Sequence, residues 1–179
     1  MKKINTSRLV LKAMSLRDSD NLRLILGDAE TAWWFDSFVL DDSRLIEYFI
    51  RKGYLSKDSR HYGIYEKGSD TVIGVVQVYI SENEKKRELG YVLSKAHRGK
   101  GYMTEAIKAV CNRIFYNPAV DAVTLRVLPR NLPSQAVARK VGFVLKPQKE
   151  CEKATTFLDS LPMDRLVLTR ERHLSYKAA

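Results

Sequence analysis

The sequence predicts an α+β domain built on a mixed, mostly antiparallel sheet. Strand-like segments rich in Tyr, Ile and Val follow one another between residues 61 and 93, and their connections are too short for a crossover helix. From residue 102 onwards the pattern changes to helix, strand and helix, which indicates one parallel crossover unit. A chain of 179 residues with 45% hydrophobic content suits a single domain spanning residues 1–179.

The first third of the chain predicts one strand and two helices. Residues 7–12 alternate weakly between apolar and polar side chains, as in a half-buried strand. Ser15 with an acidic residue three positions later is typical of a helix start, and Gly27 is typical of its end. A second helix is expected from residue 41 or 42 to residue 51, with Gly53 after it.

The middle of the chain predicts an antiparallel meander. Residues 61–66 and 71–81 are typical of strands, and the turn at Gly68-Ser69-Asp70 joins them into a hairpin. A third strand is expected at residues 87–93, after a charged turn. This early meander argues against a doubly wound nucleotide-binding fold, because strands and helices alternate from the start in such folds.

The last part of the chain predicts the crossover unit and a closing pair of strands. Ala106, Ile107, Val110 and Ile114 form the apolar stripe of a helix. The tail from Arg170 to Lys177 is polar and is expected to fray. The expected elements are a helix at 102–115, a strand at 122–128, a helix at 133–141 ended by Gly142, and strands at 143–145 and 163–168.

The charge of the chain indicates an anionic partner. Lys and Arg number 31 against 21 Asp and Glu, which gives a formal net charge of +10. Nucleic acid, anionic lipid and a polyphosphate cofactor all have the required charge, and a purely solubilising role stays open. A basic stripe with interleaved aromatics, or a helix-turn-helix, would favour nucleic acid. Neither is evident in the sequence, so no nucleic-acid partner is expected.

Other features exclude several protein classes. No apolar run approaches the ~18–20 residues that cross a bilayer, so no membrane-spanning segment is expected. A membrane is not among the expected partners. The basic N-terminus has no apolar segment behind it, so no signal peptide is expected and the protein is expected to be cytoplasmic. Cys111 and Cys151 lie far apart, and His61, His97 and His173 have no ligand spacing, so no metal site is expected.

The segment at residues 97–104 combines the parts of a pyrophosphate cradle. Gly99 and Gly101 allow a sharp turn and a close approach of the backbone to a ligand. The helix expected after them offers free N–H groups and the positive end of its dipole. Arg98 and Lys100 add full positive charge.

Two other phosphate-binding loops do not fit this segment. A Walker A loop requires Lys directly after the last glycine, where this chain has Tyr102. A dinucleotide fingerprint requires glycine where this chain has Thr104. A single Gly-x-Gly is weak evidence, so a plain tight turn stays open.

A second constellation follows the strand expected at residues 122–128. Ser134 comes three positions after Asn131, and Gly142-Phe143 comes eleven and twelve positions after it. Asn and Ser also suit a helix N-cap, so a structural role stays open beside a functional one.

Together these motifs resemble the GNAT acetyltransferase superfamily. Arg98-x-x-Gly101-x-Met103 is similar to its Arg/Gln-x-x-Gly-x-Gly/Ala signature, with Met103 in the place of a small residue. The Asn131 constellation is in the register of a frequent superfamily pattern. The resemblance covers nearly the whole chain and is strongest from Glu88 to Phe143. Within the superfamily the chain looks like the ribosomal-protein-alanine acetyltransferase branch, through Thr6-x-Arg8-Leu9-x-Leu11, Glu88 to Leu93 and Thr104-Glu105-Ala106.

The resemblance implies a mixed sheet of six or seven strands that splays at its centre and is flanked by about four helices. Acetyl-CoA would lie in the split as co-substrate, with its pantetheine on an exposed strand edge and its pyrophosphate on backbone N–H groups. The cofactor-binding residues that the resemblance implies are Tyr91, Val92, Leu93, Arg98, Gly99, Lys100, Gly101, Tyr102, Met103, Thr104, Asn131 and Ser134.

The implied reaction is the attack of a neutral amine on a thioester. Because an α-amino group has a pKa of ~8 and a lysine of ~10.4, a base or desolvation must remove a proton. Glu88 is the candidate general base, and a surface ion pair with Lys86 or Arg87 is the alternative. Ser134 is the candidate donor to the leaving thiolate, because Ala138 replaces the tyrosine that the superfamily often uses as general acid.

The acceptor is the least determined part of the reaction. Trp33, Trp34 and Phe35 fall where the superfamily forms its acceptor wall, although a packed aromatic cluster would explain them equally well. The resemblance implies transfer to a protein N-terminus. A small amine of polyamine, amino-acid or aminoglycoside type, CoA binding without transfer, and a homodimeric assembly all stay open.

Overall fold

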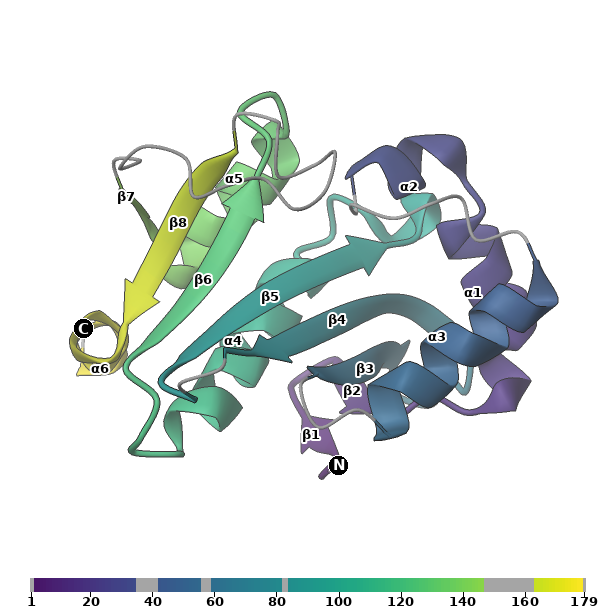
Figure 1. The fold of residues 1–179 in the computed structure, drawn as a ribbon, viewed down its shortest axis with the longest axis horizontal. Helices are drawn as coiled ribbons and strands as arrows, with labels where there is room; N and C mark the ends of the chain where they lie inside the picture. Colours follow the sequence, from purple (N-terminus) through teal and green to yellow (C-terminus); the bar gives the residue numbers. More distant parts are fainter. Residues whose placement is uncertain (1, 35–41, 56–58, 82–83, 147–162, 179) are drawn as a thin grey trace.

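The computed structural model describes residues 2–34, 42–55, 59–81, 84–146 and 163–178. These residues form one eight-stranded sheet with the order β1-β2-β3-β4-β5-β6-β8-β7 (Figure 1). β5 and β6 pair in parallel, and every other neighbouring pair is antiparallel. The strands are β1 (Ile4–Asn5), β2 (Leu9–Lys12), β3 (Ser59–Glu66), β4 (Val72–Ile80), β5 (Lys86–Leu93), β6 (Ala122–Val127), β7 (Val144–Lys146) and β8 (Asp164–Thr169).

Helices cover both faces of the sheet. One core lies between the sheet and α4 and α5, and a second lies between the sheet and α1 and α3. β4 is buried from Val72 to Val78 because its alternate side chains enter these two cores. The helices are α1 (Ser19–Leu26), α2 (Ala29–Trp34), α3 (Ser43–Leu55), α4 (Tyr102–Phe115), α5 (Leu132–Val141) and α6 (Arg170–Ala178), with short 3₁₀ turns at Leu16–Asp18 and Lys95–His97.

The predicted α+β class and the mixed, mostly antiparallel sheet are confirmed. The short β1 and β7 raise the strand count to eight, and α2 and α6 raise the number of α-helices above the expected four. The helix start at Ser15 is a capping box with Asp18, and Gly142 ends α5 with φ of 105°. Both signals act over a few residues, which is why the sequence alone predicts them.

The end of α3 corrects one prediction. Gly53 does not stop the helix, which continues to Leu55. A Cβ at Gly53 would lie 2.4 Å from Cβ of His61 on β3, so glycine is required for the close packing of helix and strand. The distance between segments that are far apart in sequence, and not the local conformation, determines this residue.

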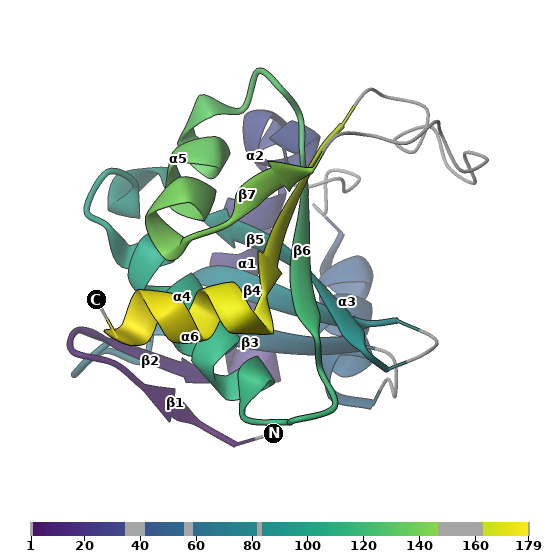
Figure 2. The ribbon, with the colours of Figure 1, turned by 90° about the vertical axis from the view of Figure 1, so that its left-hand side faces the viewer.

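The C-terminal tail corrects a second prediction, because it is the helix α6 and not a frayed end (Figure 2). Arg170 donates hydrogen bonds to the carbonyl oxygens of Phe115 and Val120, and Arg172 donates to Gly142. His173 is buried and stacks on the Phe115 ring at 4.7 Å. These contacts hold a helix of polar composition against the end of α4.

The sheet splays between β5 and β6, as the family resemblance implies. Their parallel pairing runs only from Lys86↔Ala122 to Leu89↔Leu125. Beyond this point the strands diverge, and in Figure 1 their upper ends lie well apart. Within the described residues, the edge of β5 from Gly90 to Leu93 therefore has no partner strand on its β6 side.

Candidate active site

A cleft of about 1440 Å³ occupies the split between β5 and β6. Its lining includes the unpaired edge of β5, the N-terminus of α4 and the N-terminus of α5. Backbone N–H and C=O groups at such an inner edge are available to pair with an extended ligand. Of the residues implied by the resemblance, all except Lys100 line this cleft within the described part of the chain.

The loop before α4 presents a run of free backbone N–H groups. Gly99 and Gly101 have φ of 78° and 80°, which is the left-handed region that favours glycine. From Gly99 to Thr104, no N–H group donates a hydrogen bond to another described residue. The first intrahelical bond is donated by Glu105 to the carbonyl oxygen of Gly101. This arrangement suits an anion at the positive end of the α4 dipole.

A partly buried carboxylate on α4 holds the loop to the N-terminal strands. Glu105 accepts hydrogen bonds from the hydroxyls of Thr6 and Ser7 and from the backbone and guanidinium of Arg8, at 2.6–2.9 Å. Arg8 also donates to the carbonyl oxygen of Lys100 at 3.0 Å and lies 4.6 Å from the centre of the Tyr102 ring. The N-terminal motif of the sequence thus fixes the shape of the loop.

Burial alone would raise the pKa of Glu105, but these hydrogen bonds outweigh burial and lower the pKa to about 2. The carboxylate is therefore charged throughout the neutral range. The sequence signals both ends of this contact as motif residues, but it does not reveal that they meet.

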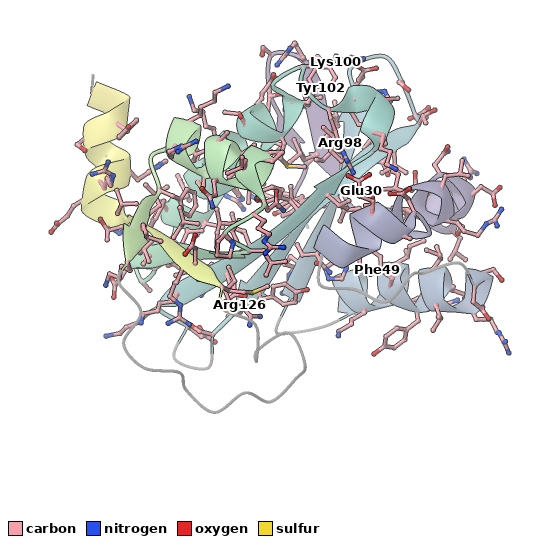
Figure 3. The ribbon with its side chains drawn as sticks, turned by 90° about the horizontal axis from the view of Figure 1, so that it is seen from above. Glu30, Phe49, Arg98, Lys100, Tyr102 and Arg126 are labelled. Atoms are coloured by element: carbon pink, nitrogen blue, oxygen red, sulfur yellow. The ribbon has the colours of Figure 1, made fainter. Side chains whose placement is uncertain are left out.

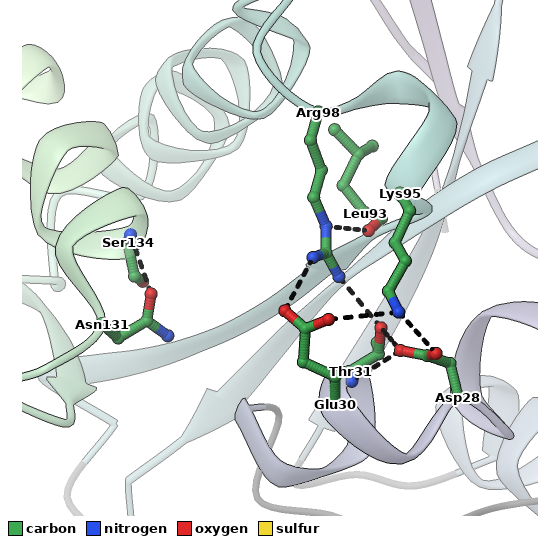
Figure 4. Close-up of polar contacts among 8 residues, drawn as sticks. All are labelled: Asp28, Glu30, Thr31, Leu93, Lys95, Arg98, Asn131 and Ser134. Carbon is green, nitrogen blue, oxygen red and sulfur yellow. Dashed lines mark hydrogen bonds and ion pairs between the residues drawn. The ribbon is translucent and has the colours of Figure 1, made fainter.

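Lys95 and Arg98, in the segment between β5 and α4, bind residues at the start of α2 (Figure 4). Arg98 donates to the carbonyl oxygen of Leu93 at 3.2 Å and to the hydroxyl of Thr31 at 2.9 Å, and it pairs with Glu30 at 3.5 Å. Lys95 pairs with Asp28 at 2.8 Å and with Glu30 at 3.1 Å.

The hydrogen bond and charge of Lys95 lower the pKa of Asp28, which also accepts bonds from Thr31 at the start of α2. The sequence predicts that Arg98 faces a pyrophosphate. In the structure its guanidinium also pairs with Glu30 of α2. Figure 3 shows Arg98 beside Glu30, whereas Lys100 points outwards. Lys95, Asp28 and Glu30 have no motif in the sequence that indicates this cluster.

Ser134 and Tyr91 meet across the cleft. The Tyr91 hydroxyl lies 2.6 Å from Oγ of Ser134 and 3.1 Å from the Ser134 carbonyl oxygen, and its single proton can be donated to either atom. Burial raises the pKa of Tyr91 to about 12, against the opposite effect of the Ser134 hydrogen bond, so the phenol keeps its proton. When Tyr91 donates to Ser134 Oγ, the serine O–H is free to donate to a third atom in the cleft.

Asn131 has the capping role that the sequence left open. Its side-chain oxygen accepts the N–H of Ser134 at 3.1 Å, which caps α5. Its amide N–H groups remain for a second partner, since this contact uses only the oxygen. Ala138 is fully buried in the core, so α5 offers no phenol at this position.

Glu88 lies on the opposite face of the sheet from α4. Its partner is Arg126, at 2.8 Å, and neither of the predicted neighbours Lys86 and Arg87. Arg87 turns away and donates to backbone carbonyl oxygens. The prediction of an ion pair is thus correct in kind and wrong in partner, because strand pairing brings β6 beside β5.

Gln77 is a further polar side chain of the cleft that sequence reasoning missed. It is 7% exposed, and its Nε2 lies 3.2 Å from Nε2 of the buried His61. His61 Nδ1 lies 3.2 Å from the Phe49 carbonyl oxygen, which can only accept, so the proton is on Nδ1 and Nε2 accepts from Gln77. Burial lowers the pKa of His61 to about 4, so the ring is neutral.

The predicted aromatic acceptor wall is only partly described. α2 includes the backbone of Trp33 and Trp34, while Phe35 lies outside the described residues. Across the described ranges, no cluster of three or more His, Cys, Asp or Glu is arranged to hold a metal ion. Over the same ranges, none of the helices has both the length and the apolar character needed to span a bilayer.

Comparison with known proteins identifies the family of the chain. The model of the acetyltransferase (GNAT) domain family matches residues 8–144. A probable N-acetyltransferase of Bacillus subtilis is 39% identical over 103 residues, which is 56% of this chain and 55% of that protein. The chain thus spans about half the length of this curated relative.

Solved structures show the same fold. A GNAT-family acetyltransferase from Bacillus anthracis aligns with a TM-score of 0.79 at 18% identity, over 95% of this chain and 99% of that chain. A spermidine N-acetyltransferase from Vibrio cholerae, in complex with CoA and spermine, aligns with 0.77 at 17% identity over 94% and 99%. A ribosomal L7/L12 α-N-protein acetyltransferase in complex with CoA aligns with 0.77 at 18% identity over 94% and 98%.

The family match includes the splayed strands β5 and β6, the glycine loop and α5, which form much of the cleft. The chain therefore belongs to the acetyltransferase (GNAT) domain family, a family of acyl-transferring enzymes.

Proposed function

We propose that the protein transfers the acetyl group of acetyl-CoA to a primary amine, and that this amine is the N-terminus of a protein, as in the ribosomal-protein-alanine branch. The observation that carries the proposal is the unpaired edge of β5 beside the free N–H groups of Gly99 to Thr104. An extended amide chain can pair with the first and a diphosphate with the second. Acetyl-CoA has both groups and supplies the activated thioester.

The residues around the cleft would hold this co-substrate at three points. The backbone from Gly90 to Leu93 pairs with the pantetheine amides, and the loop before α4 binds the diphosphate. The side-chain amide of Asn131 donates to the pantetheine, because its oxygen is already used as the α5 cap. Glu105 and Arg8 keep the loop in its binding conformation before any ligand arrives.

Ser134 stabilises the thiolate that leaves when the amine attacks. Tyr91 donates to Ser134 Oγ and orients the serine proton towards the sulfur, so the pair does the work of the missing tyrosine at position 138. Glu88 accepts the proton of the attacking amine through water, with Arg126 holding the carboxylate in place.

The fraction of amine that is neutral near pH 7 favours an N-terminal amine over a lysine-like one as the acceptor. At pH 7.4 about one α-amino group in five is neutral, whereas only about one lysine-type amine in a thousand is neutral. The solved neighbours include a spermidine enzyme and a protein N-terminal enzyme at the same TM-score, so the fold alone does not select the acceptor.

Binding of acetyl-CoA is expected to depend on Gly99. An added Cβ at Gly99 or at Gly68 meets no atom within 4 Å, and both residues have positive φ, of 78° and 83°. The variants Gly99→Ala and Gly68→Ala therefore carry a similar backbone strain of about 1 kcal/mol. Calorimetry should show an acetyl-CoA affinity about tenfold lower in Gly99→Ala than in Gly68→Ala. Equal affinities in the two variants would exclude the loop from binding.

Glu88→Gln is expected to lower kcat/KM for an α-amine by about tenfold at pH 7, because part of the amine is already neutral. A general base produces an acidic limb in the pH–rate profile, and the variant should lose this limb. Glu47→Gln is the matched control, since Glu47 is ion-paired with Arg51 on the surface of α3. An unaltered pH–rate profile in Glu88→Gln excludes the base role.

CoA binding without transfer is the competing function, and the buried Ala138 favours it. A free-thiol assay with a panel of α-amines, polyamines and aminoglycosides distinguishes the two functions. Release of CoA only in the presence of an amine supports transfer. Tight acetyl-CoA binding without amine-dependent release supports the competing function.

A further inference from the structure

We infer that the acceptor carries a carboxylate close to its reactive amine. A row of three cations, Arg126, Arg165 and Lys146, binds this carboxylate on the face of the sheet away from α4. The inference rests on the proposed function and concerns the class of amine. It is carried by the register of β6, β8 and β7 and by the polar groups that share the cleft with them.

The row crosses three neighbouring strands. Arg126 of β6 lies directly opposite Arg165 of β8, and Arg165 lies directly opposite Lys146 of β7. Like charges that lie directly opposite each other on neighbouring strands destabilise a sheet, whereas cross-strand pairs of opposite charge stabilise it. Three cations in one row are therefore an arrangement that an anion would stabilise.

All three side chains are on the face of the sheet away from α4. Leu125 precedes Arg126 on β6, and Leu166 follows Arg165 on β8. Both leucines are buried in the core beneath α4 and α5. Because successive side chains on a strand alternate between faces, Arg126 and Arg165 are on the other face, and Lys146 shares it as the partner of Arg165. All three line the cleft, and Figure 3 shows Arg126 on the opposite side of the sheet from Tyr102.

The charges of this row are not balanced within the described part of the chain. Arg126 is engaged by Glu88. Arg165 and Lys146 make no ion pair with any described residue, and both are exposed. The loop before α4, which would bind the diphosphate of the co-substrate, lies across the split from this row. The row is therefore available to the acceptor.

The amine end of the acceptor has its own polar partner in the same cleft. Gln77 is nine-tenths buried, and its Nε2 is used by His61, so its side-chain oxygen makes no hydrogen bond among the described residues. A carbonyl oxygen accepts an N–H of an amine. Its cross-strand neighbour Gly90, at the start of the unpaired β5 edge, has no side chain to block the approach.

The spacing of strands sets the distance between the two ends. Gln77 is on β4 and Arg126 on β6, two strands apart, which is ~10 Å or more at a strand spacing of ~4.8 Å. This span suits an N-terminal amine followed by an acidic side chain in the next one or two residues. A polyamine would place a second positive charge against the row, which is unfavourable.

The test compares peptide acceptors that differ only in charge. Three otherwise identical peptides have glutamate, glutamine or lysine at their second and third residues. We expect kcat/KM to be about tenfold higher for the glutamate peptide than for the glutamine peptide, and lower again for the lysine peptide and for spermidine. Binding of the same peptides to the protein saturated with CoA, measured by calorimetry, should follow the same order.

Charge variants locate the preference. Arg165→Gln should reduce the glutamate-to-glutamine ratio about tenfold, and Arg165→Lys should retain most of it. Lys108→Gln, on the exposed side of α4, removes the same charge at a distance and should leave the ratio unchanged.

The outcomes separate this inference from the proposed function. Transfer that is faster to the lysine peptide or to spermidine, or a ratio that Arg165→Gln and Lys108→Gln change equally, overturns the inference alone. Preferential binding of the glutamate peptide without acetylation supports the inference and overturns the proposed function. Binding of the three peptides with equal affinity, in the absence of transfer, overturns both.

Discussion

Ser134→Ala is expected to lower kcat about 100-fold with little change in acetyl-CoA affinity. The serine hydroxyl lines the cleft and lies 2.6 Å from the partly buried hydroxyl of Tyr91, which orients it. A hydrogen bond to a departing thiolate strengthens as charge develops on the sulfur, so its loss acts on the transition state and not on binding. A factor of about 100 is the lower end of the usual contribution of such a donor.

The measurement is steady-state turnover with a free-thiol readout, together with acetyl-CoA affinity by calorimetry. Ser175→Ala, on the exposed face of α6, is the matched control and should behave as the wild type. Tyr91→Phe should lower kcat by a smaller factor, because it removes the group that orients the serine and leaves the serine hydroxyl in place. Turnover of Ser134→Ala within twofold of the wild type would remove Ser134 from the mechanism.

Glu105→Gln is expected to lower the free energy of unfolding by about 2–3 kcal/mol at pH 7. The carboxylate accepts bonds from Thr6, Ser7 and Arg8 and is mostly buried, with 15% of its side chain exposed. A pKa lowered from 4.5 to about 2 corresponds to about 3 kcal/mol of extra stability for the charged form in the folded state. For a chain of this length, such a loss lowers Tm by roughly 5–10 °C.

The pH dependence of this loss has a defined sign. The pKa of Glu105 is lower in the folded state than in the unfolded state, so its contribution is complete above about pH 4.5 and is lost as the pH falls towards 2. Urea unfolding at pH 7, 5 and 3 should therefore show a difference between wild type and Glu105→Gln that shrinks at pH 3. Glu171→Gln, an exposed carboxylate in the first turn of α6, should show no such difference. A pH-independent gap would mean that Gln fails for steric reasons and not through lost charge.

Local signals explain why much of the fold is predictable from the sequence. The β3–β4 hairpin depends on a turn with Gly68 at φ of 83°, and α4 depends on an apolar stripe that follows Gly101. The Asn131 cap of α5 acts across three residues. In each case the atoms that interact are neighbours in the chain, so residue type and spacing contain the information.

The errors in the sequence-based predictions share one cause, which is contact between distant segments. Gly53 is required by the packing of α3 on His61, and α6 is held by Arg170 and Arg172 against α4 and the end of α5. Glu88 pairs with Arg126 across 38 residues, because β5 and β6 lie side by side. No local propensity records such pairings.

The sequence by itself determined the order of most of the helices and strands and the position of the glycine loop before α4, since these depend on backbone conformation over a few residues. Only the tertiary structure decided which side chains act together. The Tyr91–Ser134 pair, the clamp of Glu105 on Arg8 and the cation row of Arg126, Arg165 and Lys146 join segments that are far apart in the chain. Strand register and helix docking bring them together, and both are set by burial over the whole core, where a shift of one residue would turn each strand side chain to the opposite face.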